Sequence, residues 1–467
     1  MKPSMLSLSL STCVALGVLP VACVTSSNNP GPTVQVDAGD AGPGTPDDSG
    51  VVVPSTCPAP TKGPTTHRSI TADETWTADA SPHIVPFDIG ISAKVTLEPC
   101  AEVRIAGGAT ITLQANGSLV GDGTPSNRIL IGAQDPAKPW AVIRAIGGSM
   151  HLAYATIQDG GDPLNTRPVL AGMLYGQLGG DPATAATNAF SLQHVTLKGS
   201  KSNGVVISDT ASFSDDSTDL VVTGSALYPI SLPPRVLSSL PAGTYTGNAQ
   251  DEILLPGAGV TGDVITDQTM HDRGVPYHVG IPSAAGQLRV GASSTTVPLA
   301  TLTIEPGVIV RFQKGAYFEV EHFSGKNPAT GALIAKGTAD KPILLTSAET
   351  PPTPGDWIGL SFGGVTDPST VVDHMEIQYA GLQTSGGSLS CASGLAAAAV
   401  SIFGQPPSAF ITNSKFTHCV AGINSGWNGT QIDFTATNTF SDVPGCKLTN
   451  PPDVNNSCTG RPPCAVP

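Results

Sequence analysis

The chain has 467 residues, of which 12% are charged, 53 are glycine and 42 are proline. Glycine and proline interrupt helices, so this composition argues against a mainly helical protein, while 40% hydrophobic residues argue against a disordered polar chain. The net charge of −14 disfavours nucleic acid and anionic membrane surfaces as partners, and leaves neutral ligands, cationic ligands and Ca²⁺ open.

The first 22 residues are predicted to be a signal peptide. Lys2 precedes an apolar run, "MLSLSLSTCVALGVLP", which leads into "LPVAC" ending at Cys23. This resembles a bacterial lipoprotein signal, which implies a lipid on Cys23 that anchors the protein in a membrane. Val24 in place of Asp disfavours retention at an inner membrane by the same resemblance. We therefore expect a cell-envelope location, as an outer-membrane lipoprotein or, as the alternative, a secreted protein.

Residues 23–61 are predicted to be a flexible tether. Between Val24 and Thr61 there is no Lys or Arg, and Pro, Gly, Asp, Ser and Thr dominate. Such a segment buries too little apolar surface to order itself. Its "DAGDAG" stretch lacks the closing Glu of a Ca²⁺ loop and is expected to be a solvated spacer.

The remaining sequence repeats itself once. The matched segments are 95–105 with 302–312, 117–133 with 331–347, and 189–197 with 409–417. Trp140 and Trp357 also correspond. We expect two diverged copies, 62–250 and 251–450, followed by a Cys/Pro-rich tail at 451–467. Within each copy, β-branched runs of four to seven residues end at Gly, Asn, Asp or Pro, which predicts short strands joined by turns.

The second copy reads "LTIEPGVIVRF", "GALIAKGTADKPILLTS" and "DWIGLSF". These phrases resemble the right-handed parallel β-helices, of pectin-lyase-like fold, exported by Gram-negative bacteria. The resemblance implies an all-β solenoid, a right-handed parallel β-helix built from two diverged copies and preceded by a disordered linker. Inward ladders of Val, Ile, Leu and Ala would form its core, with Pro342 at a strand start. Gly123 and Gly337 would be left-handed corners.

Seven cysteines follow Cys13 and Cys23, and none form a CxxC motif. Disulfides in an oxidising compartment explain them better than a zinc site. The expected pairs are Cys57–Cys100, Cys391–Cys419, and Cys446 with Cys458 or Cys464. The odd count means that one thiol is unpaired or that one of these pairings is misassigned.

Pectate-lyase-like and pectin-hydrolase-like enzymes share the β-helix fold, so acid/base residues need attention. Glu319 and Glu321 lie two apart in a predicted strand, hence on one outer face, with Phe318 and Val320 inside. This pair is the weak catalytic or metal-binding candidate, and a solvated strand face is the simpler explanation. The enzyme hypothesis predicts that such carboxylates converge with an Arg or Lys.

Further acidic groups are weak Ca²⁺ candidates. They are Asp215, Asp216 and Asp219 in "SDDSTD", and Asp159 and Asp162 in "QDGGDP". Turn aspartates explain both groups more simply. Asp373 and His374 are neighbours in a predicted strand, so we expect them to point to opposite faces and form no dyad.

Other conspicuous residues have structural explanations. Glu98 with Arg104 and Glu305 with Arg311 recur at matching positions, which predicts ion pairs rather than catalysis. "MHDRG" (His271, Asp272, Arg273) is expected to be a connecting loop. The tryptophans are expected to pack inside. Together with Tyr154, Tyr175, Tyr277, Tyr317 and Tyr379 they would form a sugar-stacking surface only if aligned on one exposed face.

The sequence thus predicts a non-enzymatic binding, adhesion or structural display protein of the cell surface, with carbohydrate as a candidate ligand. A polysaccharide lyase or glycoside hydrolase is the alternative. No cofactor is expected, apart from the open case of Ca²⁺.

Overall fold

The computed structural model describes residues 45–46, 52–53, 56–161, 171–178, 187–257, 262–282, 284–291, 298–320, 330–383, 390–392 and 397–465. The expected signal peptide, the lipidation site Cys23, Asp162 and Glu321 lie outside these residues. So does most of the expected tether. No helix within the described ranges is long and apolar enough to cross a membrane.

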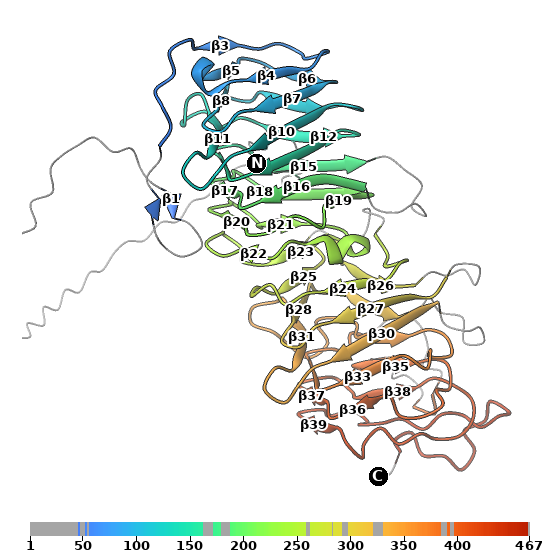
Figure 1. Cartoon of the computed structure of the whole chain (residues 1–467). Coiled ribbons are helices and arrows are strands. Elements are labelled where there is room, and N and C mark those ends of the chain that lie inside the picture. Colours follow the sequence, from blue (N-terminus) through green and yellow to red (C-terminus); the bar gives the residue numbers. More distant parts are fainter. Residues whose placement is uncertain are drawn as a thin grey trace, which may run out of the picture. The chain divides into compact units, whose positions relative to one another are not determined.

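Parallel β-sheets make up nearly all of the regular secondary structure in the described chain (Figure 1). Sheet I contains β4 (Glu74–Trp76), β7 (Lys94–Leu97), β10 (Ser118–Asp122), β13 (Ser149–Ala153), β16 (Thr187–Gln193) and β19 (Ala211–Phe213). Sheet II contains β3 (Thr65–Thr66), β5 (His83–Val85), β8 (Glu102–Ile105), β11 (Ile129–Ala133), β14 (Ala155–Gln158), β17 (Thr196–Lys198), β20 (Leu220–Thr223) and β22 (Gly243–Thr244).

Three further sheets complete the fold. Sheet III contains β6 (Ile89–Ile91), β9 (Thr110–Leu113), β12 (Val142–Ile146), β15 (Gly172–Leu178), β18 (Asn203–Asp209), β21 (Ile230–Ser231), β23 (Ile253–Leu255), β25 (Tyr277–Val279), β28 (Ile309–Phe312), β31 (Ile343–Ser347), β34 (Met375–Gln378), β37 (Lys415–Thr417) and β39 (Thr439–Ser441). Sheet IV contains β24 (Gln268–Met270), β27 (Ala300–Ile304), β30 (Gly331–Lys336), β33 (Val371–Asp373) and β36 (Ile411–Thr412). Sheet V contains β26 (Gln287–Val290), β29 (Tyr317–Val320), β32 (Leu360–Phe362), β35 (Val400–Ile402) and β38 (Ile423–Ser425). Two short strands, β1 (Thr45–Pro46) and β2 (Val52–Val53), pair antiparallel within the expected tether.

The chain visits three sheets in turn and then returns to the first. β7, β8 and β9 belong to sheets I, II and III, and β10 then pairs in parallel with β7. The same cycle runs through β28, β29 and β30 in sheets III, V and IV. A winding of this kind is compatible with a β-helix solenoid, in which every strand bonds to the turns before and after it.

Alternate side chains of most strands fill the interior. In β29, Phe318 and Val320 are buried, as expected from their alternation with polar neighbours. The two matched tryptophans also pack inside. The indole N–H of Trp140 donates to the carbonyl of Gln158 at 2.9 Å, and that of Trp357 donates to Gln378 at 2.8 Å.

The glycine corners differ from expectation. Gly123 and Gly337 do not have left-handed φ. The residues with positive φ lie one turn later, at Tyr154 (49°) and His374 (48°). A Cβ on Gly123 would lie 2.6 Å from the Tyr154 carbonyl oxygen, and one on Gly337 would lie 2.4 Å from that of His374. Close backbone approach, rather than φ, therefore requires glycine here. Pro342 immediately precedes β31, as predicted.

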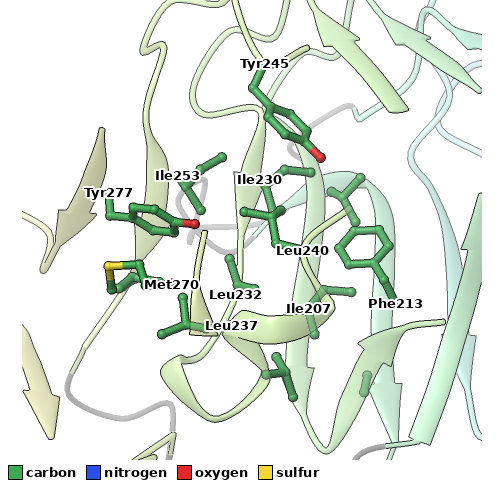
Figure 2. Close-up of a cluster of buried hydrophobic side chains, with 14 of the residues drawn as sticks. Ile207, Phe213, Ile230, Leu232, Leu237, Leu240, Tyr245, Ile253, Met270 and Tyr277 are labelled. Atoms are coloured by element: carbon green, nitrogen blue, oxygen red, sulfur yellow. The ribbon is translucent and has the colours of Figure 1, made fainter. Parts of the chain in front are cut away.

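The winding is irregular between the two matched halves. A 3₁₀ segment, η3 (Pro234–Ser239), lies where the next strand of sheet I would follow, and sheets I and II both end in this region. Among the sheets that the described residues form, only sheet III continues, through β21, β23 and β25. Figure 2 shows the buried side chains here, including Leu237, Leu240, Tyr245 and Met270 around η3.

Segments matched by sequence lie in different sheets as a result. β8 corresponds to β28, yet β8 belongs to sheet II and β28 to sheet III, the sheet that also holds β9. The second half is therefore displaced from the first by one face of the winding. A second 3₁₀ segment, η1 (Ala78–Ala80), lies in the first turn.

The disulfides correct two predicted pairs. The bonds are Cys57–Cys100, Cys391–Cys458 and Cys446–Cys464. The pairs Cys391–Cys419 and Cys446–Cys458 were wrong, whereas Cys57–Cys100 and the alternative Cys446–Cys464 are confirmed. Cys419 is instead a free thiol in the core, with its sulfur 3.4 Å from the carbonyl oxygen of Ile377. Cys391 and Cys446 form their disulfides with the two cysteines of the C-terminal tail. Burial raises the pKa of the Cys419 thiol to about 11.

The tether ends earlier than predicted. Residues 56–61, assigned by sequence to the flexible segment, are attached to the folded part. The Thr56 amide donates to the Ser126 carbonyl at 3.0 Å, and the Thr61 amide donates to Asp79. Together with the Cys57–Cys100 bond, these contacts fix the entry of the chain into the first turns.

Candidate functional site

Glu319 lies on the outer face of sheet V, where strand pairing places it beside Arg289. β26 and β29 pair in register, with Arg289 opposite Glu319. The Arg289 Nε donates to Glu319 Oε2 at 2.8 Å, and its Nη1 donates to Asp263 Oδ2 at 3.2 Å. The Glu319 and Arg289 side chains are 13% and 20% exposed, so this cluster is partly desolvated. Carboxylates and a guanidinium thus converge here, as the enzyme hypothesis requires.

Two neighbouring polar residues complete the cluster. The Arg289 Nη2 donates to the Tyr317 hydroxyl at 3.1 Å, and this hydroxyl donates to Gln287 Oε1 at 2.5 Å. Burial raises the pKa of Tyr317, an effect that the Arg289 charge opposes. Burial alone would lower the pKa of Arg289, but its hydrogen bond to Glu319 and the charges of Asp263 and Glu319 raise it.

The chemistry of this cluster favours binding a ligand over transferring a proton. Each of the three guanidinium nitrogens of Arg289 donates to an acceptor inside the cluster. A general base or acid needs a carboxylate free to exchange a proton with substrate, whereas Glu319 accepts a charge-assisted hydrogen bond. The second predicted carboxylate, Glu321, lies outside the described residues, and Asp373 lies on sheet IV.

Sequence reasoning missed Arg289 and Asp263. Neither falls within a matched segment, and the turn length that brings Arg289 next to Glu319 is not fixed by the sequence pattern. An arginine at an outward position in the preceding strand, "QLRV", was the available signal.

The outer face of sheet V is polar beyond Glu319. Strand register continues from Glu319 to Ser361 and then to Ser401, whereas Asn424 on the next strand is buried. The connections on both sides of these strands are long in sequence: 348–359 and 379–399 precede β32 and β35, and 363–370 and 403–410 follow them. Sheet V thus presents a line of hydrogen-bonding groups between long connections.

Asp373 and His374 do form a dyad, contrary to prediction. His374 has left-handed φ, which turns its ring back toward its neighbour, and its Nδ1 lies 2.9 Å from Asp373 Oδ2. The other oxygen of Asp373 accepts from the Thr412 hydroxyl and the Asn413 amide, each at 2.8 Å. Burial would raise the pKa of Asp373, but these hydrogen bonds and His374 lower it. The strand-alternation rule failed because His374 lies just beyond the end of β33.

The weak metal candidates do not gather. Asp216 accepts from the Ser191 hydroxyl at 2.8 Å and from Gln193, and Asp219 pairs with His194 at 3.1 Å. Asp215 stands beside Asp216 on the same connection, while Asp159 occupies a left-handed turn elsewhere. Over the described part of the chain, no group of three or more His, Cys, Asp and Glu side chains could hold a metal ion.

The predicted repeated ion pairs were wrong in their partners. Arg104 pairs with Glu102 instead of Glu98, whose carboxylate accepts from the Ala78 amide at 3.1 Å. Arg311 pairs with Glu252, which also accepts from His278 Nδ1 at 2.7 Å.

In the predicted loop, His271 Nδ1 lies 2.8 Å from Glu305 Oε1, and Arg273 donates to the Leu240 carbonyl. Asp272 donates its amide to Glu305. Strand register, which the sequence does not reveal, decided all of these partners.

The aromatic residues do not form one surface. Trp140, Trp357 and Tyr277 are buried in the core. Tyr175 and Tyr317 lie on the outer faces of sheets III and V, while Tyr154 and Tyr379 lie at turns.

Comparison with known proteins finds no matching family model, no matching curated protein and no matching solved structure.

Proposed function

We propose that this chain is an exported right-handed parallel β-helix of the cell envelope that binds or displays, rather than cleaves, a polar polymer such as a polysaccharide. The proposal includes two diverged copies of one coil and a lipid on Cys23. The parallel three-sheet winding supports the architecture, and the matched segments support the duplication. The lipoprotein-like "LPVAC" supports the envelope location.

One observation supports the binding function: the Glu319 carboxylate accepts a hydrogen bond from Arg289 and neutralises its charge. A guanidinium held by Glu319, Asp263 and Tyr317 is a rigid, pre-organised group. The line from Arg289 through Glu319 to Ser361 and Ser401 offers successive donors and acceptors along an extended ligand. Each unit of a polymer would meet one turn of the winding.

A polysaccharide lyase or glycoside hydrolase is the second candidate, and the same convergence favours it. Carboxylates and an arginine meet on one sheet face, which this class of enzyme needs. Against it, catalysis would have to proceed through carboxylates that already neutralise Arg289.

The deciding experiment incubates the purified protein with neutral and acidic polysaccharides. We expect retention on immobilised polymer without new reducing or unsaturated ends. Arg289→Gln should weaken retention, because it removes the central cation of the cluster, while Arg144→Gln on sheet III serves as a matched control. Product formation abolished by Glu319→Gln would replace the binding function with the enzymatic one.

The lipid anchor is tested separately. Metabolic labelling with a fatty acid should mark the wild-type chain and leave Cys23→Ser unlabelled. Labelling of neither chain would favour simple secretion.

A further inference from the structure

Three side chains at successive turns form a stack between sheets I and II. Tyr154, His194 and Asp219 follow or precede the strands there, and their φ angles are 49°, 53° and 49°. The Tyr154 amide donates to the carbonyl of the residue before His194, and the His194 amide donates to that before Asp219, each at 2.9 Å. The Tyr154 and His194 rings stack with centroids 4.4 Å apart, and His194 Nδ1 lies 3.1 Å from Asp219 Oδ2. We call this set the first corner ladder.

The same three residue types recur in the same order at the end of sheet III. Tyr379, His418 and Asp442 have φ of 58°, 53° and 54°. Their amides follow the same pattern, at 3.3 Å and 3.1 Å. The Tyr379 and His418 rings lie nearly parallel with centroids 5.3 Å apart, and His418 Nδ1 lies 3.5 Å from Asp442 Oδ2. This set is the second corner ladder.

The two ladders are not copies of one another through the sequence repeat. The repeat matches β14 with β34, so Tyr379 corresponds to Asp159, while Tyr154 corresponds to His374. The Tyr–His–Asp order therefore arises twice at different corners of the winding, and common inheritance from the repeat does not explain it.

The fold does not require these side chains. At the ends of the sheet II strands, Asp159, Gly199 and Gly224 hold the same left-handed conformation, with φ of 61°, 74° and 68°. The Asp159 amide donates to the residue before Gly199 in the same pattern. Glycine adopts this conformation without strain, whereas it is uncommon for a bulky residue such as tyrosine. Aromatic rings at two other corners thus point to a use beyond turning the chain.

The ladders also offer accessible chemistry. The His194 and Asp219 side chains are 29% and 41% exposed, and those of His418 and Asp442 are 47% and 71% exposed. The tyrosine is the first residue of each ladder along the chain. In the first ladder, the corner residue one turn earlier is Gly123, which has no side chain. In the second ladder, the carbonyl of the residue before Tyr379 accepts a hydrogen bond from the Trp357 indole.

We propose that the two corner ladders are two separate binding sites for a neutral sugar unit. The C–H face of a pyranose would lie against the tyrosine ring, and its hydroxyls would bond to the histidine–aspartate pair. Both sites carry an aspartate in a chain of net charge −14, so a neutral sugar fits better than a uronate. The inference rests on the proposed carbohydrate function and names the substrate class and further contact points.

Calorimetric titration with trisaccharides tests the proposal, because a trisaccharide is short enough to report each site separately. The probes are neutral trisaccharides of glucan, xylan and mannan type, with trigalacturonate as the acidic arm. We expect two sites per chain for a neutral probe in the Arg289→Gln background, where the proposed contact on sheet V is removed. Tyr154→Asn and Tyr379→Asn should each weaken one site about tenfold or more, and the double variant should lose both. Asn tolerates left-handed φ, so the turns should persist, and unchanged melting temperatures would verify this.

Tyr175→Asn, a half-buried outward tyrosine away from the corners, is the matched control and should keep two sites. Two sites retained in both corner variants would overturn the inference. If binding is lost only in Arg289→Gln, the inference fails and the proposed function stands. If wild type binds neither neutral nor acidic carbohydrate, both fail. Preference for trigalacturonate would overturn the assignment to neutral sugars.

Discussion

The Glu252–His278–Arg311 cluster should contribute most among the ion pairs to stability, since it bridges β23, β25 and β28 where sheet III alone is continuous. The Glu252 and His278 side chains are 7% and 9% exposed, and Arg311 is 34% exposed. Burial would raise the pKa of Glu252, but the hydrogen bond and charge of His278, together with Arg311, lower it. The carboxylate is therefore ionised and paired at neutral pH.

Removing the carboxylate leaves two buried or half-buried partners without compensation. Breaking a buried pair costs about 3–5 kcal/mol. Because Arg311 is one-third exposed and water can solvate it, we expect the lower end, about 3 kcal/mol, for Glu252→Ala. The matched control is Glu102→Ala, which removes a pair with Arg104 whose side chains are 32% and 27% exposed. That change should cost only about 0.5–1 kcal/mol.

Denaturant unfolding followed by tryptophan fluorescence would measure both free energies of unfolding. Hydrogen exchange would locate the effect, with faster exchange expected at β23 and β25 in Glu252→Ala. Since the pKa of Glu252 is lowered, its contribution is present above about pH 4.3 and is lost as the pH falls below that value. Equal losses in the two variants, or exchange unchanged at the junction, would refute the reasoning.

Three further predictions concern other parts of the chain. The rings of His67 and His83 share a 2.9 Å N···N hydrogen bond, and burial lowers the pKa of both. Their contribution to the free energy of unfolding should therefore be fully present above about pH 6.5 and be lost as the pH falls below it. Melting curves from pH 8 to 4 should show this loss, and it should shrink in a His67→Phe/His83→Phe variant; an unaltered pH profile would contradict it. Replacing both Cys57 and Cys100 by Ser opens a loop of 43 residues and should cost about 4 kcal/mol in the free energy of unfolding, whereas a loss under 1 kcal/mol would show that the link is dispensable. Cys419, buried and with a raised pKa, should react with a thiol reagent only in denaturant; rapid labelling of the folded protein would place it outside the core.

The sequence predicted strands and interior well because both depend on local alternation. The inward positions of Phe318 and Val320, the burial of Trp140 and Trp357, and Pro342 before β31 followed from the pattern of neighbouring residues. These features need no knowledge of which strand lies alongside.

Partners across turns could not be predicted in the same way. Arg311 was expected to pair with Glu305, six residues away, and instead pairs with Glu252 two strands earlier in the sheet. The length of each turn sets such neighbours, and insertions in the connections alter it. For the candidate site, the sequence identified Glu319 but missed Arg289, which lies on the adjacent strand. The dyad of Asp373 and His374 escaped for a different reason, a left-handed backbone at the end of β33.

The displacement of matched segments onto different sheets has a consequence for evolution. If a coil were duplicated in whole turns, corresponding side chains of the two copies would lie on the same face. The two copies could then act together on one ligand. Here the matched strands β8 and β28 belong to different sheets, so residues at matched positions point in different directions. The two matched halves therefore present corresponding residues to different surroundings. One half can acquire a feature such as the Arg289–Glu319 cluster, while the corresponding strand β9, with Thr112 in place of Glu319, serves another surface.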